Sequence, residues 1–158
     1  MYKFLWLGIS FFVIVTDQLT KTWATDNLPF AQSVALTPFL NFTLLHNTGA
    51  AFSFLADAGG WQRWFFIGLA AIISIGLFIW ILRLSAKQIW LGIALALILG
   101  GAIGNLIDRA IYGYVIDFVD FYYQQWHWPA FNIADSAISI GVFMLLIDAL
   151  FLVEKKHD

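Results

Sequence analysis

Long apolar runs constrain this chain more than any other feature. Trp64 to Leu82 and Ile89 to Ile107 carry no charge, and Ser136 to Val153 is interrupted by Asp148 alone. A fourth run extends from Phe4 to about Ala24. A helix needs about 20 residues to cross a hydrocarbon core of about 30 Å. Because 61% of the 158 residues are hydrophobic and only 11% are charged, the sequence predicts an integral membrane protein.

The first apolar run also has features of a cleaved signal peptide, because Lys3 precedes it. However, Asp17, Gln18 and Lys21 lie between its apolar part and the nearest small-x-small triplet. We therefore expect an uncleaved helix. The predicted single membrane domain covers residues 1–158, with helices at about 4–24, 64–82, 89–108 and 135–153.

The basic residues beside the spans predict how the chain is oriented. A four-helix arrangement places five of the eight Lys and Arg residues on one side, and these are Lys3, Arg83, Lys87, Lys155 and Lys156. Short cytoplasmic segments carry the excess of Lys and Arg. We therefore expect both termini in the cytoplasm and the segments 25–63 and 109–134 at the outer face.

The first outer segment has the composition of short strands. The stretch "SVALTPFLNFTLLHNTGAAFSFL" is rich in β-branched and aromatic residues, with Pro38 at a strand edge or break and Gly49 at a turn. In the third helix, Gly100 and Gly104 have the spacing that allows close helix approach. Packing within one bundle is favoured over a dimer contact, so we expect a monomer.

Several classes of function are disfavoured by composition. The formal net charge is −2, and no Lys or Arg cluster alternates with aromatic residues, so a nucleic-acid partner is not expected. The absence of cysteine excludes disulfides, a thiol nucleophile and cysteine-ligated metals. The three histidines have no metal-ligand spacing. We expect neither a metal nor a cofactor.

Charged groups in the predicted spans need partners or a function, because a charge inside a bilayer costs at least a few kcal/mol. Asp17 and Lys21 are four residues apart on the first helix and can form an ion pair. A structural role for this pair and a role in a site are both open. At the outer end of the third helix, Arg109 either holds a carbonyl or carboxylate of a ligand or pairs with Asp108.

Two further carboxylates have no neutralising neighbour in sequence. Asp117 and Asp135 both fall at the outer surface, and two acids in a partly dry site would share one proton near neutrality. Such a pair can activate a water molecule, as in aspartic peptidases. A proton relay or an ion site would use the same residues. Asp120 either substitutes for Asp117 or faces water.

Five motifs in order resemble the lipoprotein signal peptidase family, also called signal peptidase II. The motifs are "DQLTK" (17–21), "NTGAAF" (47–52), "GNLIDR" (104–109), "VIDF" (115–118) and "FNIADSAI" (131–138). The resemblance covers nearly the whole chain. Members of this family are bacterial inner-membrane aspartic endopeptidases that cut prolipoproteins on the amino side of a cysteine carrying diacylglycerol.

The resemblance implies a fold and a role for each matching residue. The fold is an all-α membrane protein of four transmembrane helices with a small extracytoplasmic β-sheet cradle and an interfacial helix. The implied roles are a catalytic dyad (Asp117, Asp135), contact with or positioning of substrate (Asn47, Asn105, Arg109, Asn132) and support of the site (Asp17, Lys21). The implied partners are lipidated prolipoproteins and membrane lipid.

A lipid-anchored substrate would explain an acid at the outer end of the fourth helix. The anchored cysteine keeps the scissile bond at the depth of the headgroups, where Asp135 is expected. Withdrawing an acyl chain from the bilayer costs about 0.8 kcal/mol for each CH2 exposed. Chemistry at the interface avoids this cost.

Overall fold

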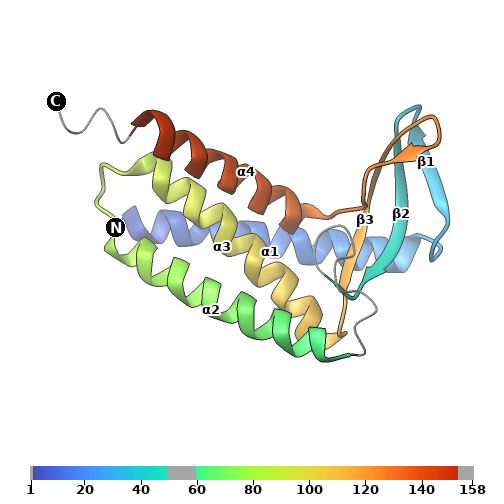
Figure 1. Cartoon of the computed structure of the whole chain (residues 1–158), viewed down its shortest axis with the longest axis horizontal. Helices are drawn as coiled ribbons and strands as arrows, with labels where there is room; N and C mark the ends of the chain where they lie inside the picture. The colour runs from blue at the N-terminus through green and yellow to red at the C-terminus, as the bar shows by residue number, and fades with distance from the viewer. Residues whose placement is uncertain (1, 50–59, 153–158) are drawn as a thin grey trace.

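Four helices form the membrane part of the protein. The computed structural model describes residues 2–49 and 60–152, and within them four helices are long and apolar enough to cross a membrane. They are α1 (Tyr2–Asn27), α2 (Trp61–Arg83), α3 (Ile89–Ile111) and α4 (Ile133–Ile147), which continues as the π-helix η2 (Asp148–Leu152). Figure 1 shows them side by side, with successive helices running in opposite directions.

A four-stranded antiparallel sheet lies across one end of the bundle (Figure 1). Its strands, in spatial order, are β1 (Ser33–Thr37), β2 (Leu40–Asn47), β3 (Val115–Tyr123) and β4 (Trp126–His127). The beginning of α1 and the end of α4 lie at the opposite end of the molecule. The predicted fold class, four spans with a small sheet, is confirmed.

The second outer segment differs from the prediction. Residues 109–134 were expected to be loop, yet they contain the end of α3 and the strands β3 and β4. In "VIDFVDFYY" two acids interrupt the apolar pattern, although β-branched and aromatic residues dominate it. No interfacial helix occurs at 28–49 or 112–132, and residues 50–59 lie outside the described part of the chain.

Small residues let α3 occupy the centre of the bundle, where it contacts the other three helices. A Cβ atom at Gly100 would lie 2.8 Å from the Ser10 carbonyl oxygen of α1. A Cβ at Gly141 of α4 would lie 2.7 Å from the Ala94 oxygen of α3. Gly100 therefore mediates packing within the chain, as predicted. The outer surfaces of α1, α2 and α4 expose many large apolar side chains, as expected for helices that face lipid.

A tight turn joins α3 to β3. Gly113 has a φ of 88°, a conformation that side chains disfavour. Arg63 of α2 donates from Nε to the Arg109 oxygen (3.0 Å) and from Nη2 to the Ala110 oxygen (2.9 Å). These bonds add to the backbone bonds at the end of α3, where the Arg109 oxygen also accepts from the Gly113 amide (3.2 Å). The turn directs β3 back across the ends of the helices.

Asn132 determines where α4 begins. Its side-chain oxygen accepts a hydrogen bond from the Asp135 amide, and Asp135 accepts one from the Asn132 amide, forming a capping box. The helix therefore starts at Ile133, earlier than the predicted residue 135. Asp135 is consequently fixed in the first turn of α4.

Candidate active site

Asp117 and Asp135 lie on different elements but face the same cavity. Asp117 is in β3, one of the two inner strands of the sheet, and is only 2% exposed. The cavity has a volume of about 1600 Å³ and extends from beneath the sheet to apolar side chains of α2, α3 and α4. The structure therefore brings together the two carboxylates that the sequence analysis singled out.

Asn132 connects the two acids directly. Its Nδ2 donates to Asp117 Oδ1 at 2.8 Å, while its Oδ1 accepts from the Asp135 amide at 2.9 Å. The same Nδ2 lies within hydrogen-bond distance of the Ile116 oxygen (3.2 Å). Asn132 is completely buried. A side chain that caps a helix and bonds a strand fixes the relative position of both carboxylates.

Asn105 of α3 holds the other side of Asp135. Its Oδ1 accepts from Lys21 Nζ (3.0 Å) and from Asn132 Nδ2 (3.3 Å). Because both contacts need an acceptor, the Asn105 amide is oriented with its Nδ2 toward Asp135. That Nδ2 donates to Asp135 Oδ1 at 2.8 Å.

Lys21 is almost fully buried between two carboxylates. Its Nζ lies 2.8 Å from Asp17 Oδ2 and 2.9 Å from Asp108 Oδ2. The ion pair predicted between Lys21 and Asp17 is confirmed, and Asp108 joins it. The alternative pairing of Asp108 with Arg109 is wrong, since Asp108 also accepts from Gln18 Nε2 (2.9 Å) and the Ile116 amide (3.1 Å).

Asp17 connects this ionic cluster to α4. Its Oδ1 accepts from the Ala134 amide at 2.9 Å, one residue before Asp135. An ionised carboxylate near a helix N-terminus is favoured by the free amide groups there. Asp17 and Lys21 thus contact the frame around the two acids, not the acids themselves. Gln18, whose Nε2 bonds Asp17 and Asp108, was missed in the sequence because a single uncharged side chain gives no signal.

Asn47 and Arg109 both border the cavity. Asn47 donates from Nδ2 to Asp117 Oδ2 at 3.1 Å, so each oxygen of that carboxylate accepts one amide. Arg109 donates from Nη2 to the Gly49 oxygen at 2.8 Å, and its guanidinium lies 5.2 Å from the Phe66 ring centroid. Its buried Nε has no hydrogen-bond partner among the described residues. Arg109 is thus a donor at the cavity wall.

Burial raises the pKa of Asp117 to about 7, and the nearby charge of Asp135 adds to this effect. Hydrogen bonds from Asn47 and Asn132 and the charge of Lys21 act in the opposite direction. A carboxyl group with a pKa near 7 exchanges its proton readily at neutral pH. The environment of Asp117 therefore suits acid and base catalysis.

The sequence leaves open whether Asp120 substitutes for Asp117 or faces water, and the second of these alternatives is wrong. Asp120 is 5% exposed, and its carboxylate lies 2.9 Å from His127 Nδ1. Asn41 and Thr43 also donate to it, each at 3.2 Å. Asp120 thus has its own set of partners in the sheet. His127 was missed as a partner because β4 was not predicted.

The fold is that of a multi-pass membrane protein, and it is similar to the folds of solved bacterial membrane enzymes. Two solved structures, each described as a bacterial membrane enzyme, are 34% identical in sequence. One has a TM-score of 0.82 and covers 92% of this chain and 87% of its own. The other has a TM-score of 0.81, with 93% of each chain covered.

Sequence comparisons define the family more narrowly. A family model described as signal peptidase (SPase) II matches residues 9–151. A lipoprotein signal peptidase of Acinetobacter baumannii is 57% identical, with 98% of this chain and 88% of the relative covered. One from Acinetobacter baylyi is 55% identical over 99% of this chain and 92% of the relative. This chain belongs to the signal peptidase II family, and is therefore a membrane-embedded protease.

Proposed function

We propose that this protein is an aspartic endopeptidase that removes the signal peptide from diacylglyceryl-modified prolipoproteins through Asp117 and Asp135. Membership of the family supports signal-peptide removal from prolipoproteins. The observation that carries the catalytic assignment is the link through Asn132, which donates to the Asp117 carboxylate from Nδ2 and to the Asp135 carboxylate from its backbone amide, in one cavity. Asp120 of β3 lines the same cavity, but its carboxylate bonds Asn41, Thr43 and His127 and has no hydrogen bond to Asn132.

The pair acts with one proton between its two carboxyl groups. The ionised member takes a proton from a water molecule, whose oxygen attacks the scissile carbonyl carbon. The protonated member donates to the carbonyl oxygen as the tetrahedral intermediate forms. When that intermediate collapses, the C–N bond breaks and the amine of the cysteine leaves with a proton. Either acid can serve as the base, because the proton belongs to the coupled pair.

Asn47, Asn105, Arg109 and Asn132 position the reacting groups. The three asparagines bond the two carboxylates. Arg109 lines the cavity, and its guanidinium is placed to donate to a substrate carbonyl. Asp17 and Lys21 support this arrangement through Ala134 and Asn105.

The apolar part of the cavity suits a substrate that arrives within the bilayer. Leu69 and Ile73 of α2 face it on one side, and Ile138 and Val142 of α4 on another. An apolar signal peptide and lipid chains lose little by moving from the bilayer to such a wall. We assign the site to the outer face of the bacterial inner membrane, with both termini cytoplasmic and the protein working as a monomer.

Cleavage of a defined substrate tests this proposal. Purified protein in detergent is incubated with a diacylglyceryl-modified peptide, with and without a chelator, and the products are identified by mass spectrometry. We expect cleavage on the amino side of the modified cysteine at the same rate under both conditions. The same peptide without the lipid is the control and should be cleaved far more slowly. A relay or transporter would leave both peptides intact, which would contradict the proposal.

A further inference from the structure

Asp120 and His127 form a second polar cluster at the cavity, separate from the two proposed catalytic acids. Asp120 is buried, whereas half of the His127 side chain is exposed. The His127 ring stacks on Tyr122, with 5.5 Å between ring centroids. Ser33 and Thr43 border the same part of the cavity, and their hydroxyl groups are 2.9 Å apart. This end of the cavity is therefore polar, unlike the end between the helices.

A β-bulge brings Asp120 to the same cavity as Asp117. Residues three apart on a regular strand point to opposite faces. In β3, however, the amides of Phe118 and Val119 both donate to the Phe131 oxygen, at 3.2 and 2.9 Å. The register of β2 with β3 also shifts at this point, between Phe42 and Leu45, so the regular alternation along β3 is interrupted. Both carboxylates therefore line one cavity.

The distance along β3 between Asp117 and Asp120 corresponds to a short length of substrate. Three residues of strand span about 10 Å, at about 3.3 Å per residue. A substrate in extended conformation covers the same distance in about three residues. We take the scissile carbonyl of the substrate to lie between Asp117 and Asp135. The substrate residue near Asp120 is then either the second residue after the lipidated cysteine or the third residue before it.

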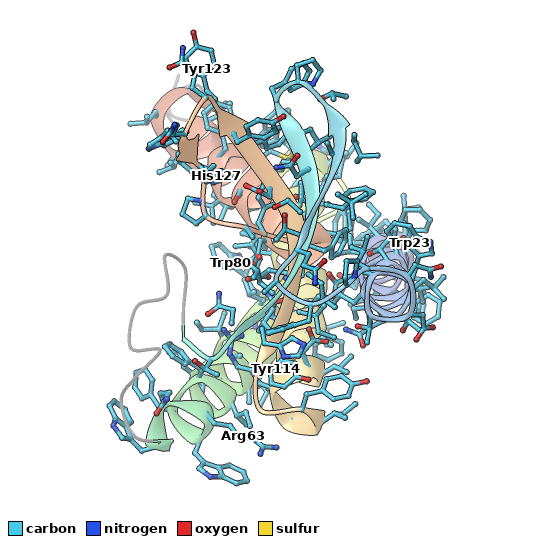
Figure 2. All side chains as sticks on the ribbon, turned by 90° about the vertical axis from the view of Figure 1, so that its right-hand side faces the viewer. Trp23, Arg63, Trp80, Tyr114, Tyr123 and His127 are labelled. Atoms are coloured by element: carbon cyan, nitrogen blue, oxygen red, sulfur yellow. The ribbon has the colours of Figure 1, made fainter. Side chains whose placement is uncertain are left out.

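The shape of the cavity decides between these two directions. Its apolar end, between α2 and α4, suits the signal peptide, which stays in the bilayer. The mature part must therefore leave along the sheet. Figure 2 looks onto the sheet from the outer end and shows His127 toward the α4 side, far from Arg63 at the start of α2.

We propose that Asp120 and His127 form the subsite for the two residues that follow the lipidated cysteine. This assignment rests on the proposed function. With Nδ1 donating to the Asp120 carboxylate, the other ring nitrogen of His127, Nε2, can hydrogen-bond a peptide group of the substrate. A carboxylate that is only 5% exposed repels a second carboxylate strongly. The subsite accepts neutral or basic side chains and disfavours acidic ones.

Competition between matched lipopeptides tests the subsite. Diacylglyceryl peptides carry Asn or Asp at the second position after the cysteine, and a second pair carries Asn or Asp at the third position before it. We expect wild-type protein to prefer Asn over Asp by about tenfold in kcat/KM at the position after the cysteine. Asp120→Asn keeps the size of the side chain and should reduce this preference to below about threefold.

His127→Ala provides a second variant, with thermal unfolding measured alongside, because it also removes a hydrogen bond to the buried Asp120. It should raise KM for the Asn peptide several-fold and leave kcat nearly unchanged, since a peptide contact is lost. An unchanged preference in Asp120→Asn, or an equal loss of rate for all four peptides, would show that the cluster only stabilises the sheet. A preference that responds to Asp120→Asn only at the position before the cysteine would also overturn the assignment. If wild-type protein cleaves none of the peptides, the proposed function fails, and this subsite with it.

Discussion

Asn132 Nδ2 lies 2.8 Å from Asp117 Oδ1, so the residue that starts α4 also holds the carboxylate of β3. Asn132→Ser keeps an oxygen that can cap the helix but removes the amide donor. We expect kcat to fall on the order of 10²-fold, because a preorganised donor beside the reacting groups is lost. The melting temperature should fall as well, because a buried hydrogen bond to Asp117 is lost. Steady-state kinetics and thermal unfolding in detergent check both, and unchanged kcat would contradict a positioning role.

Lys21 is the buried cation between Asp17 and Asp108. Lys21→Met removes its charge and leaves two buried carboxylates facing each other. We expect the free energy of unfolding to fall by about 3–5 kcal/mol, the usual effect of breaking a buried ionic group. Lys87→Met, at an exposed position, is the matched control and should change it by less than about 0.5 kcal/mol. Equal stability of the two variants would argue against the ionic cluster.

Gly101 sets the distance between α3 and α4. A Cβ atom there would overlap the carbonyl oxygen of Ala134, the residue before Asp135. Gly101→Ala should lower the free energy of unfolding by about 1–3 kcal/mol and reduce kcat as α4 shifts. Gly68→Ala is the control, because a Cβ there meets no atom within 4 Å. Thermal unfolding compares the two, and identical behaviour would show that this contact does not matter.

The pKa of Asp117, raised to about 7 by burial and by Asp135, predicts a pH-dependent rate. The pair needs one proton, so kcat should fall as pH rises above about 7, approaching tenfold for each pH unit. Rates measured from pH 5 to 9 check this limb. A constant rate from pH 6 to 9 would be inconsistent with a shared proton.

The same pKa has a consequence for stability. The folded state binds the Asp117 proton more tightly than the unfolded state does, so the free energy of unfolding should decrease as pH rises from about 4 to 7. Asp117→Asn should remove this part of the pH dependence. Chemical unfolding of both proteins at several pH values measures the difference.

The four spans and the ion pair of Asp17 with Lys21 were predictable, because apolar length and helical spacing act locally. The strand β3 was not predicted, since Asp117 and Asp120 interrupt its apolar pattern. Its bulge depends on Phe131, which is distant in sequence and invisible to a local pattern. The contact of Lys21 with Asn105 likewise requires α1 and α3 to be packed together.

The resemblance of five motifs assigned roles that residue chemistry alone left open. Spacing could not choose between a proton relay and a peptidase for Asp117 and Asp135. Asp120 shows the limit of such reasoning, because its burial depends on Asn41 and Thr43 of another strand. Tertiary contacts, not local sequence, distinguish these acids.

The central claim is that Asp117 and Asp135 share the catalytic work. The most direct test measures cleavage of one diacylglyceryl-modified peptide by wild-type protein, Asp117→Asn and Asp135→Asn, with folding verified by thermal unfolding. Each variant should remain folded and lose cleavage by at least about 10³-fold, as expected when a catalytic group is removed. Turnover at the wild-type rate by either folded variant would contradict the account.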